Sequence, residues 1–142
     1  MTSAGPRRIE VLDGPVRAVV ADLPGSKSIT NRALVCAALA DGTSRMWRVP
    51  AGDDTAAMLH CVALLGAEVV TATDGDGAVT TIGGTDGCLV PGPLELDAQL
   101  AGTTSRFVTA LAALGPGPYS VDGGAPLRRR PMAPLHDALA AR

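Results

Sequence analysis

The spacing of apolar residues predicts four helices along the chain. Between residues 28 and 40, apolar side chains recur at helical offsets, and Asp41-Gly42 stops the pattern. The predicted buried stripe of this helix comprises Ile29, Ala33, Cys36, Ala37 and Ala40. A stripe of this kind is typical of a helix that packs against the core of a globular domain.

The same period predicts the other three helices. One covers 53–66, with Asp53 as its cap and a stripe formed by Met58, Val62 and Leu65. Another covers 101–115, with an apolar face formed by Phe107, Ala110, Leu111 and Leu114. The last begins near Arg130 and continues to residue 142.

Short β-rich runs separate these helices. Residues 7–22 are predicted to form one or two strands broken at Gly14-Pro15, and 43–49 alternates like a strand. The stretch 67–84 has two β-rich runs around "DGDG", a strong hairpin signal. Further strands are predicted at "LELD" and "YSVDGG". Alternating helices and strands indicate an α/β protein.

The second half of the chain repeats the first. "RALVCAALADG" is echoed by "RFVTALAALG", and "MLHCVALLG" by "PLHDALAAR", at an offset of about 75 residues. This echo predicts two copies of a helix–strand–helix unit, of which the second stops before its hairpin. His60 and His136 are aligned within it, mid-helix among apolar residues, which is typical of half-buried structural histidines.

Charge and composition exclude several functions. The chain has 12 Lys+Arg against 14 Asp+Glu, a net charge of -2, and 2% aromatic residues, which argues against nucleic-acid binding. Three separate cysteines indicate neither a zinc site nor a disulfide framework, and Cys36 and Cys61 are predicted to be small buried residues. Without a signal peptide or membrane-length apolar run, a cytoplasmic protein that binds no membrane is predicted.

The start of the first predicted helix carries candidate chemistry. Lys27 stands just before it, and Ser28 and Arg32 are four residues apart on one helix face. Helix N-termini attract anions through unpaired N–H groups and the helix dipole. The pattern therefore predicts a pocket for a phosphate or carboxylate behind the Pro24-Gly25 turn. The competing interpretation is a Ser-capped helix with a solvated Lys and Arg.

Two further helix starts strengthen the anion-site interpretation. "AGTTSR" again places a glycine, two hydroxyls and Arg106 at a helix start, and Arg130 precedes Pro131 at another. Three such ends suit a substrate with several negative groups. Arg128 and Arg129 are predicted to be solvated, and the Asp53-Asp54 pair to cap its helix instead of catalysing acid/base chemistry.

Together these motifs resemble the N-terminal part of the 5-enolpyruvylshikimate-3-phosphate synthase family. The resemblance rests on "LPGSKSITNRALVCAALADG", "GDDTAAMLHCVALLGAEV", "LAGTTSRF" and "RRRPMAPLHDAL". The related UDP-N-acetylglucosamine enolpyruvyl transferases are less similar, with Ala-Lys-Asn where this chain has Ser26-Lys27-Ser28. Two positions depart from the family pattern, because Leu100 stands where Asn is frequent and Phe107 where Pro is common.

The resemblance implies a fold and an activity. The fold is a repeated βαβαββ unit, about two of six copies being present. Residues 1–23 would belong to the other domain, and 24–142 would form an incomplete substrate-binding domain with repeats at about 24–84 and 93–142. The activity is transfer of the enolpyruvyl group of phosphoenolpyruvate to the 5-hydroxyl of shikimate 3-phosphate, with release of phosphate and without metal or cofactor.

Site residues follow from the same resemblance. Lys27 would contact both substrates, Ser28 and Arg32 would hold shikimate 3-phosphate, and Gly102, Thr103 and Arg130 would bind phosphoenolpyruvate. The whole enzyme would be a monomer, whereas this chain alone would be inactive and prone to self-association. Two alternatives stay open: a non-catalytic anion-binding remnant, and a sister enolpyruvyl transferase with another phosphorylated acceptor.

Overall fold

The first half of the molecule folds as a helical pair covered by an antiparallel sheet. The computed structural model describes residues 8, 11, 13–19, 21, 23, 25–74 and 77–141. Its first elements are α1 (Lys27–Leu39), β1 (Thr43–Trp47), α2 (Asp53–Leu64), β2 (Glu68–Asp74) and β3 (Gly77–Gly83). The sheet order is β1-β3-β2, and the predicted hairpin is confirmed by pairing from Glu68↔Gly83 to Asp74↔Gly77.

The second half repeats the strand–helix–strand–helix order. Its elements are β4 (Leu94–Asp97), α3 (Gly102–Ala112), β5 (Tyr119–Asp122), α4 (Ala125–Arg128) and α5 (Ala133–Ala140). β4 and β5 pair in parallel, as expected for strands joined by a crossover helix. The strands predicted after residue 42 and the four longer helices are confirmed, whereas the short helix α4 was not predicted. The α/β fold class is confirmed.

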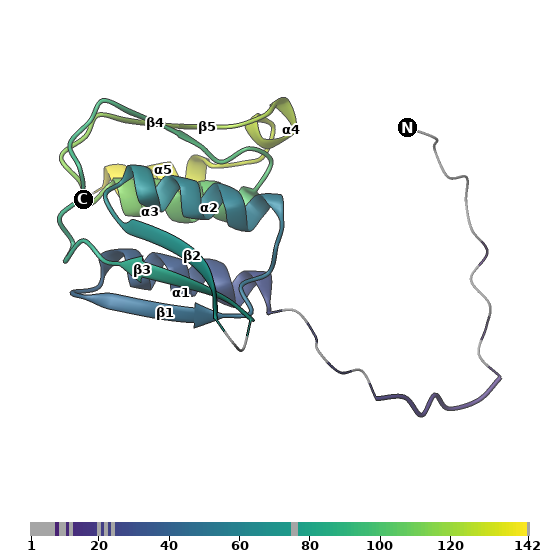
Figure 1. Ribbon diagram of the computed structural model, residues 1–142. Coiled ribbons are helices and arrows are strands. Elements are labelled where there is room, and N and C mark those ends of the chain that lie inside the picture. The colour runs from purple at the N-terminus through teal and green to yellow at the C-terminus, as the bar shows by residue number, and fades with distance from the viewer. Residues whose placement is uncertain are drawn as a thin grey trace.

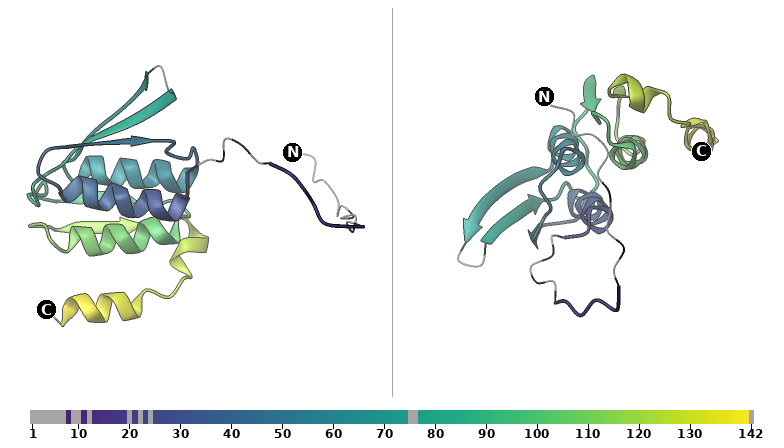
Figure 2. Two further views of the ribbon diagram at one scale, coloured as in Figure 1. Left: turned by 90° about the horizontal axis from the view of Figure 1, so that it is seen from below. Right: turned by 90° about the vertical axis from the view of Figure 1, so that its right-hand side faces the viewer.

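The core lies where α1, α2 and α3 pack together. Figure 2 shows these helices side by side in one view and end-on in the other, with α5 standing apart. Figure 1 shows β4 and β5 on one side of α2 and α3, while the β1-β3-β2 sheet covers α1 and α2. Leu34, Met58, Val62 and Val108 are completely buried between these layers, whereas α5 has no buried residue.

The predicted stripe of α2 is confirmed, but those of α1 and α3 are wrong in part. Met58, Val62 and Leu65 are at most 1% exposed. On α1, Ile29 is 70% exposed and Cys36 is exposed, because the helix turns Leu34, Ala38 and the polar Thr30 and Asn31 to its neighbours. On α3, Ala110 is exposed and Phe107 is half-buried, while Val108, Leu111 and Ala112 face the core. Leu114 lies beyond the end of this helix and is exposed.

Of the two cysteines predicted to be buried, Cys61 is buried and Cys36 is exposed. Cys61 is fully buried, and its Sγ donates to the Asp97 carbonyl at 3.6 Å. Burial, with a smaller contribution from the Asp97 charge, raises the pKa of this thiol to about 11. Cys61 therefore stays neutral at physiological pH and behaves as a small apolar core residue.

The N-terminal strand prediction is wrong for the residues that the structure describes. Residues 11, 13–19, 21 and 23 carry no strand. A strand needs a hydrogen-bonded neighbour, and none of the five strands lies beside this segment in the described pairings. Pro24 lies outside the described residues, but Gly25 has a clear role: a side chain there would collide with the Arg48 carbonyl oxygen, so the glycine lets the chain pass close to the end of β1.

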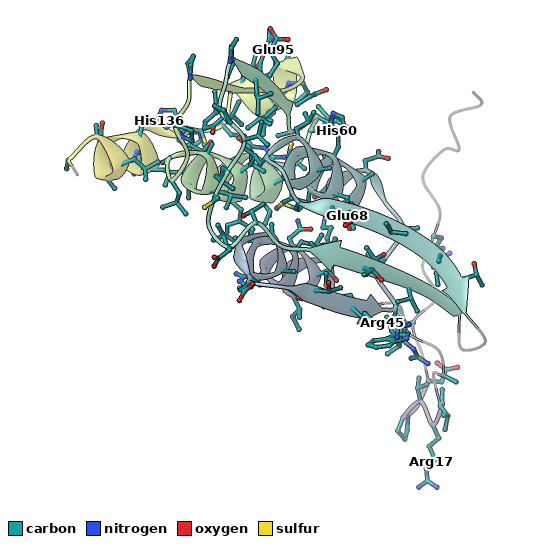
Figure 3. The ribbon with its side chains drawn as sticks, turned by 60° about the vertical axis from the view of Figure 1, so that its left-hand side comes forward. Arg17, Arg45, His60, Glu68, Glu95 and His136 are labelled. Carbon is teal, nitrogen blue, oxygen red and sulfur yellow. The ribbon has the colours of Figure 1, made fainter. Side chains whose placement is uncertain are left out.

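Two predictions about polar residues of the helices also fail. Asp53 is the first residue of α2 and not its cap, because Gly52 occupies the N-cap position. His60 and His136 are exposed instead of half-buried, and Figure 3 shows them on different helices, α2 and α5. Neither histidine is therefore needed to fill the core.

The corrected face of α1 can be tested by two substitutions in this helix. Leu34→Ala removes a fully buried side chain, so we expect the free energy of unfolding to fall by about 2–5 kcal/mol. Ile29→Ala, at a position that is 70% exposed, should change it by less than about 0.5 kcal/mol. Urea denaturation followed by circular dichroism measures both. A larger loss for Ile29→Ala would restore the apolar stripe predicted from the sequence.

Candidate anion-binding site

The N-termini of α1, α2 and α3 meet at one end of the helical layer. Asp54, in the first turn of α2, joins all three. Its Oδ2 atom forms an ion pair with Nζ of Lys27, the first residue of α1, at 2.8 Å. Its backbone carbonyl accepts a 3.0 Å hydrogen bond from Oγ1 of Thr104 in the first turn of α3. Two residues therefore tie α1 and α3 to the start of α2.

None of these three helix ends is closed by a capping side chain. The N-cap residues are Ser26, Gly52 and Ala101, and none makes a side-chain cap hydrogen bond. The alternative of a Ser-capped helix is therefore wrong in its main point: Ser26 occupies the N-cap position of α1, but its side chain makes no cap hydrogen bond. Uncapped N–H groups and three dipole ends of the same sign favour an anion at this end of the molecule.

The three residues predicted on α1 are close together, with one difference from the expected geometry. Lys27 begins the helix instead of preceding it. Arg32 reaches back one turn, where its Nη1 donates a 2.8 Å hydrogen bond to the backbone carbonyl of Ser28. The hydroxyl of Ser28 remains on an exposed residue and makes no hydrogen bond within the described part of the chain.

Gly102 brings the second group of predicted residues together. A Cβ atom added to this glycine would overlap Nη1 of Arg130 and lie 3.2 Å from Nη1 of Arg106. Two guanidinium groups therefore lie against the start of α3 where a side chain would otherwise project. Thr103, the next residue, is half-buried and has no hydrogen-bonding partner for its hydroxyl among the described residues.

Arg106 is a site residue that the sequence interpretation left without a role. Its Nη1 donates to the Gly102 carbonyl at 3.2 Å, and its Nη2 donates to the Pro131 carbonyl at 3.1 Å. It thereby fixes the segment that follows Arg130 against α3. A signal was present, because Arg106 corresponds to Arg32 in the internal repeat, and each arginine bonds the carbonyl four residues before it.

The arginines of the run 128–130 differ in their surroundings. Arg128 forms two hydrogen bonds to the carboxylate of Asp122, at 2.8 and 2.6 Å, so it is exposed but not simply solvated as predicted. These bonds, together with one from the Gly123 N–H, hold the pKa of Asp122 below its ordinary value. No carboxylate in the described part of the chain pairs with Arg130. Arg130 therefore remains a cation available to a ligand.

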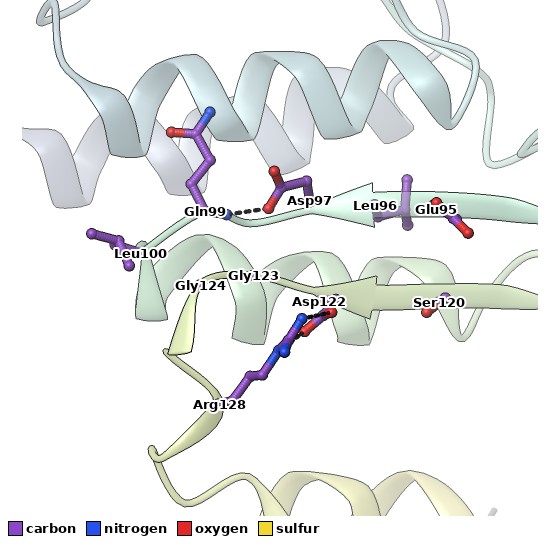
Figure 4. Close-up of a pocket in the computed structure, with 10 residues that line it drawn as sticks. All are labelled: Glu95, Leu96, Asp97, Gln99, Leu100, Ser120, Asp122, Gly123, Gly124 and Arg128. Atoms are coloured by element: carbon purple, nitrogen blue, oxygen red, sulfur yellow. Dashed lines mark hydrogen bonds and ion pairs between the residues drawn. The ribbon is translucent and has the colours of Figure 1, made fainter. Parts of the chain in front are cut away.

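A separate hollow lies beside β4 and β5, as Figure 4 shows. It has a volume of about 590 Å³ and is lined by residues that include Glu95, Asp97 and Asp122. The Asp97 side chain accepts a 2.7 Å hydrogen bond from the Gln99 backbone, and Leu100, which is 56% exposed, lies at the rim. Arg128 also lines the hollow and is paired with Asp122, so Glu95 and Asp97 leave an excess of negative charge that disfavours an anion.

The described residues offer neither a metal site nor a membrane-spanning helix. No group of three or more His, Cys, Asp or Glu side chains there could hold a metal ion. Within the same residues, every helix is too short or too polar to cross a membrane. The site defined by Lys27, Arg32, Gly102, Arg106 and Arg130 is called the anion site below.

Known proteins similar to this chain agree in family. The family model described as EPSP synthase (3-phosphoshikimate 1-carboxyvinyltransferase) matches residues 12–142. Proteins named 3-phosphoshikimate 1-carboxyvinyltransferase from Hamiltonella defensa and Trichormus variabilis are each 42% identical, over 118 and 127 residues. These alignments cover 82% and 89% of this chain but only 27% and 29% of the relatives.

Solved structures give the same result. An EPSP synthase from Acinetobacter baumannii superimposes with a TM-score of 0.72 at 26% sequence identity. The match covers 83% of this chain and 26% of that structure. The chain therefore spans little more than a quarter of the length of the proteins it matches.

The contact that joins α2 to α3 can be tested with two adjacent threonines. Thr104 is fully buried, so Thr104→Val removes its hydrogen bond to Asp54 at nearly constant volume, and we expect the free energy of unfolding to fall by about 1 kcal/mol. Thr103→Val is the control, with an expected change below about 0.5 kcal/mol. Urea denaturation measures both, and equal losses would show that the hydrogen bond does not hold the two helices together.

Proposed function

Because the chain belongs to the EPSP synthase family, we propose that it supplies part of an active site that transfers an enolpyruvyl group to shikimate 3-phosphate. The observation that carries this proposal is the anion site, where four cationic side chains gather at three uncapped helix N-termini. Phosphoenolpyruvate and shikimate 3-phosphate each carry a phosphate and a carboxylate. Fixed positive groups in such a place can bind both anions and bring them together.

The acceptor, shikimate 3-phosphate, is assigned to the α1 side of the site. Ser28 offers an unpaired hydroxyl, and Arg32 offers the guanidinium donors that its bond to the Ser28 carbonyl leaves unused. A guanidinium binds a carboxylate through paired hydrogen bonds, so Arg32 suits the carboxylate end of the acceptor. Lys27 would contact both substrates once its ammonium exchanges part of its bond to Asp54 for a ligand oxygen.

Phosphoenolpyruvate is assigned to the α3 side. Gly102 lets the ligand approach the backbone of the first turn, Thr103 adds a hydroxyl, and Arg130 supplies a charge that no described carboxylate neutralises. In the reaction, the 5-hydroxyl oxygen of the acceptor bonds to the enolpyruvyl carbon, whose bond to the phosphate oxygen breaks. The hydroxyl proton is released with the phosphate. Lys27 and Arg130 would stabilise the charge that develops on this leaving group.

The chain contributes only part of this chemistry. Proton transfer needs an acid and a base near the reacting carbon, and in the anion site the only carboxylate with a described contact is that of Asp54, which is paired with Lys27. Since the chain spans 27–29% of its curated relatives, we propose that residues outside it complete the site. A cytoplasmic location, a monomeric whole enzyme, and self-association of this chain alone belong to the same proposal.

A chimera tests the proposed activity. In it, this chain replaces the matching part of the Trichormus variabilis relative, and phosphate release is measured with phosphoenolpyruvate and shikimate 3-phosphate. We expect turnover of roughly 1 per second or more, and none from the 142-residue chain alone. Arg130→Ala should lower kcat/KM for phosphoenolpyruvate by about ten- to a hundredfold, as expected for a lost charge-assisted hydrogen bond. Arg129→Ala is the control.

The outcomes of this assay separate the alternatives. Activity only with a different phosphorylated acceptor would indicate a sister transferase. Binding of both substrates by a folded chimera without turnover would indicate a non-catalytic anion-binding module.

Gly102 allows a test of selectivity in the same chimera. A methyl group added by Gly102→Ala would meet the guanidinium of Arg130, which can shift for a compact ligand but leaves less room for a longer one. We expect the inhibition constant of glyphosate, a bulkier inhibitor that resembles phosphoenolpyruvate, to rise at least about tenfold more than KM for phosphoenolpyruvate. Gly52→Ala is the matched control, since it opens α2 and an added Cβ would have nothing within 4 Å. Equal losses for both ligands would limit Gly102 to a role in the turn.

A further inference from the structure

An aromatic ring from α3 supports Arg32 on α1. The Cζ atom of Arg32 lies 5.5 Å from the centroid of the Phe107 ring, within the range of a cation–π contact. The two residues are far apart in sequence and belong to different copies of the repeat. This contact therefore exists only because α1 and α3 pack side by side.

The ring is itself held in place. Phe107 is half-buried and packs against the buried hydrophobic cluster that includes Leu34 and Val108. One side of the ring thus rests on the core. An arginine that contacts a ring fixed in this way loses conformational freedom, because both its guanidinium and its apolar stem can pack against a rigid surface.

The support leaves the charge and most donors of Arg32 available. A guanidinium has five N–H donors, and the described contacts use one of them, for the Ser28 carbonyl. A carboxylate partner would hold the guanidinium too, but it would occupy two donors and neutralise the charge. No carboxylate in the described residues pairs with Arg32. An aromatic face fixes the group without competing for the ligand's oxygens.

Arg106, at the equivalent position of the second repeat, is held differently. Both of its described hydrogen bonds go to backbone carbonyls, of Gly102 and Pro131. Its role is to fix a chain segment. Of these two equivalent arginines, only Arg32, to which the acceptor is assigned, contacts an aromatic ring in the described part of the chain.

We propose that Phe107 is a positioning residue for the acceptor: its ring orients the Arg32 guanidinium so that the remaining donors face the acceptor's carboxylate. The proposal rests on the proposed function for the identity of the ligand. It does not depend on that function for the contact itself. An exposed cation–π contact corresponds to about a two- to fivefold effect on affinity, or about 0.5–1 kcal/mol.

The test uses the whole 142-residue chain with ¹⁵N-labelled arginine. Arg32→Lys identifies the side-chain Nε–Hε resonance of Arg32, and titration with shikimate 3-phosphate gives the Kd. Phe107→Leu keeps an apolar side chain but removes the aromatic face, whereas Phe107→Tyr keeps the face. We expect Phe107→Leu to move the Arg32 resonance from an upfield position toward that of the exposed Arg129, and to raise the Kd about two- to fivefold. Phe107→Tyr should leave both unchanged.

Each outcome has a distinct meaning. An Arg32 resonance that is the same in Phe107→Leu and the wild type would overturn the contact. Phe107→Leu could shift the Arg32 resonance without changing the Kd, while Arg32→Lys weakens binding. That result would overturn the positioning role and leave the proposed function standing. A raised Kd accompanied by equal weakening in Phe107→Tyr would make Phe107 a packing residue only. If the wild-type chain alone does not bind shikimate 3-phosphate, the Kd is measured in the chimera, where an unchanged Kd for Phe107→Leu would overturn the positioning role; the resonance still reports on the contact.

Discussion

The parallel packing of α1, α2 and α3 is the constraint on which the rest of the molecule depends. Each helix carries a partial positive charge at its N-terminus, and three such ends at one place repel one another. Lys27 and Arg130 add to this excess. The carboxylate of Asp54 offsets part of it, at 2.8 Å from the Lys27 ammonium. The burial of Leu34, Met58 and Val108 holds the helices together in spite of the repulsion that remains. A bound anion would reduce this repulsion.

The sequence predicted the order of elements well, because that order depends on local period and turn chemistry. It predicted the face of α2 but only part of that of α1, where Ala37 is buried and Ile29 is not. α2 lies between β2, β4 and both other helices, so its broad apolar stripe is covered almost everywhere. α1 buries Thr30 and Asn31 near the crowded helix starts and turns Ile29 to solvent. Which side of such a helix is covered depends on neighbours that the local pattern does not reveal.

For the candidate site, too, the sequence predicted local groupings of residues but not the contacts between distant elements. Lys27, Ser28 and Arg32 stand within six residues of one another, and their helical spacing already places them together. Their side-chain partners lie on other helices: Lys27 pairs with Asp54 of α2, and Arg32 contacts Phe107 of α3. The role of Arg106 depends on the Pro131 carbonyl, which only the path of the chain after α4 brings close. No periodicity encodes such long-range contacts.

The two copies of the repeat differ in where the cation at the helix start comes from. In the first copy, the residue that opens α1 is Lys27, and the next is Ser28. At the corresponding positions the second copy has Ala101 and Gly102, so no residue in the first turn of α3 is a cation. Arg130 fills that place from a later segment, held there by Arg106, and it can do so only because position 102 lacks a side chain. Gly102 is therefore explained by the arginine beside it, and the similar helix starts have become two different halves of one anion site.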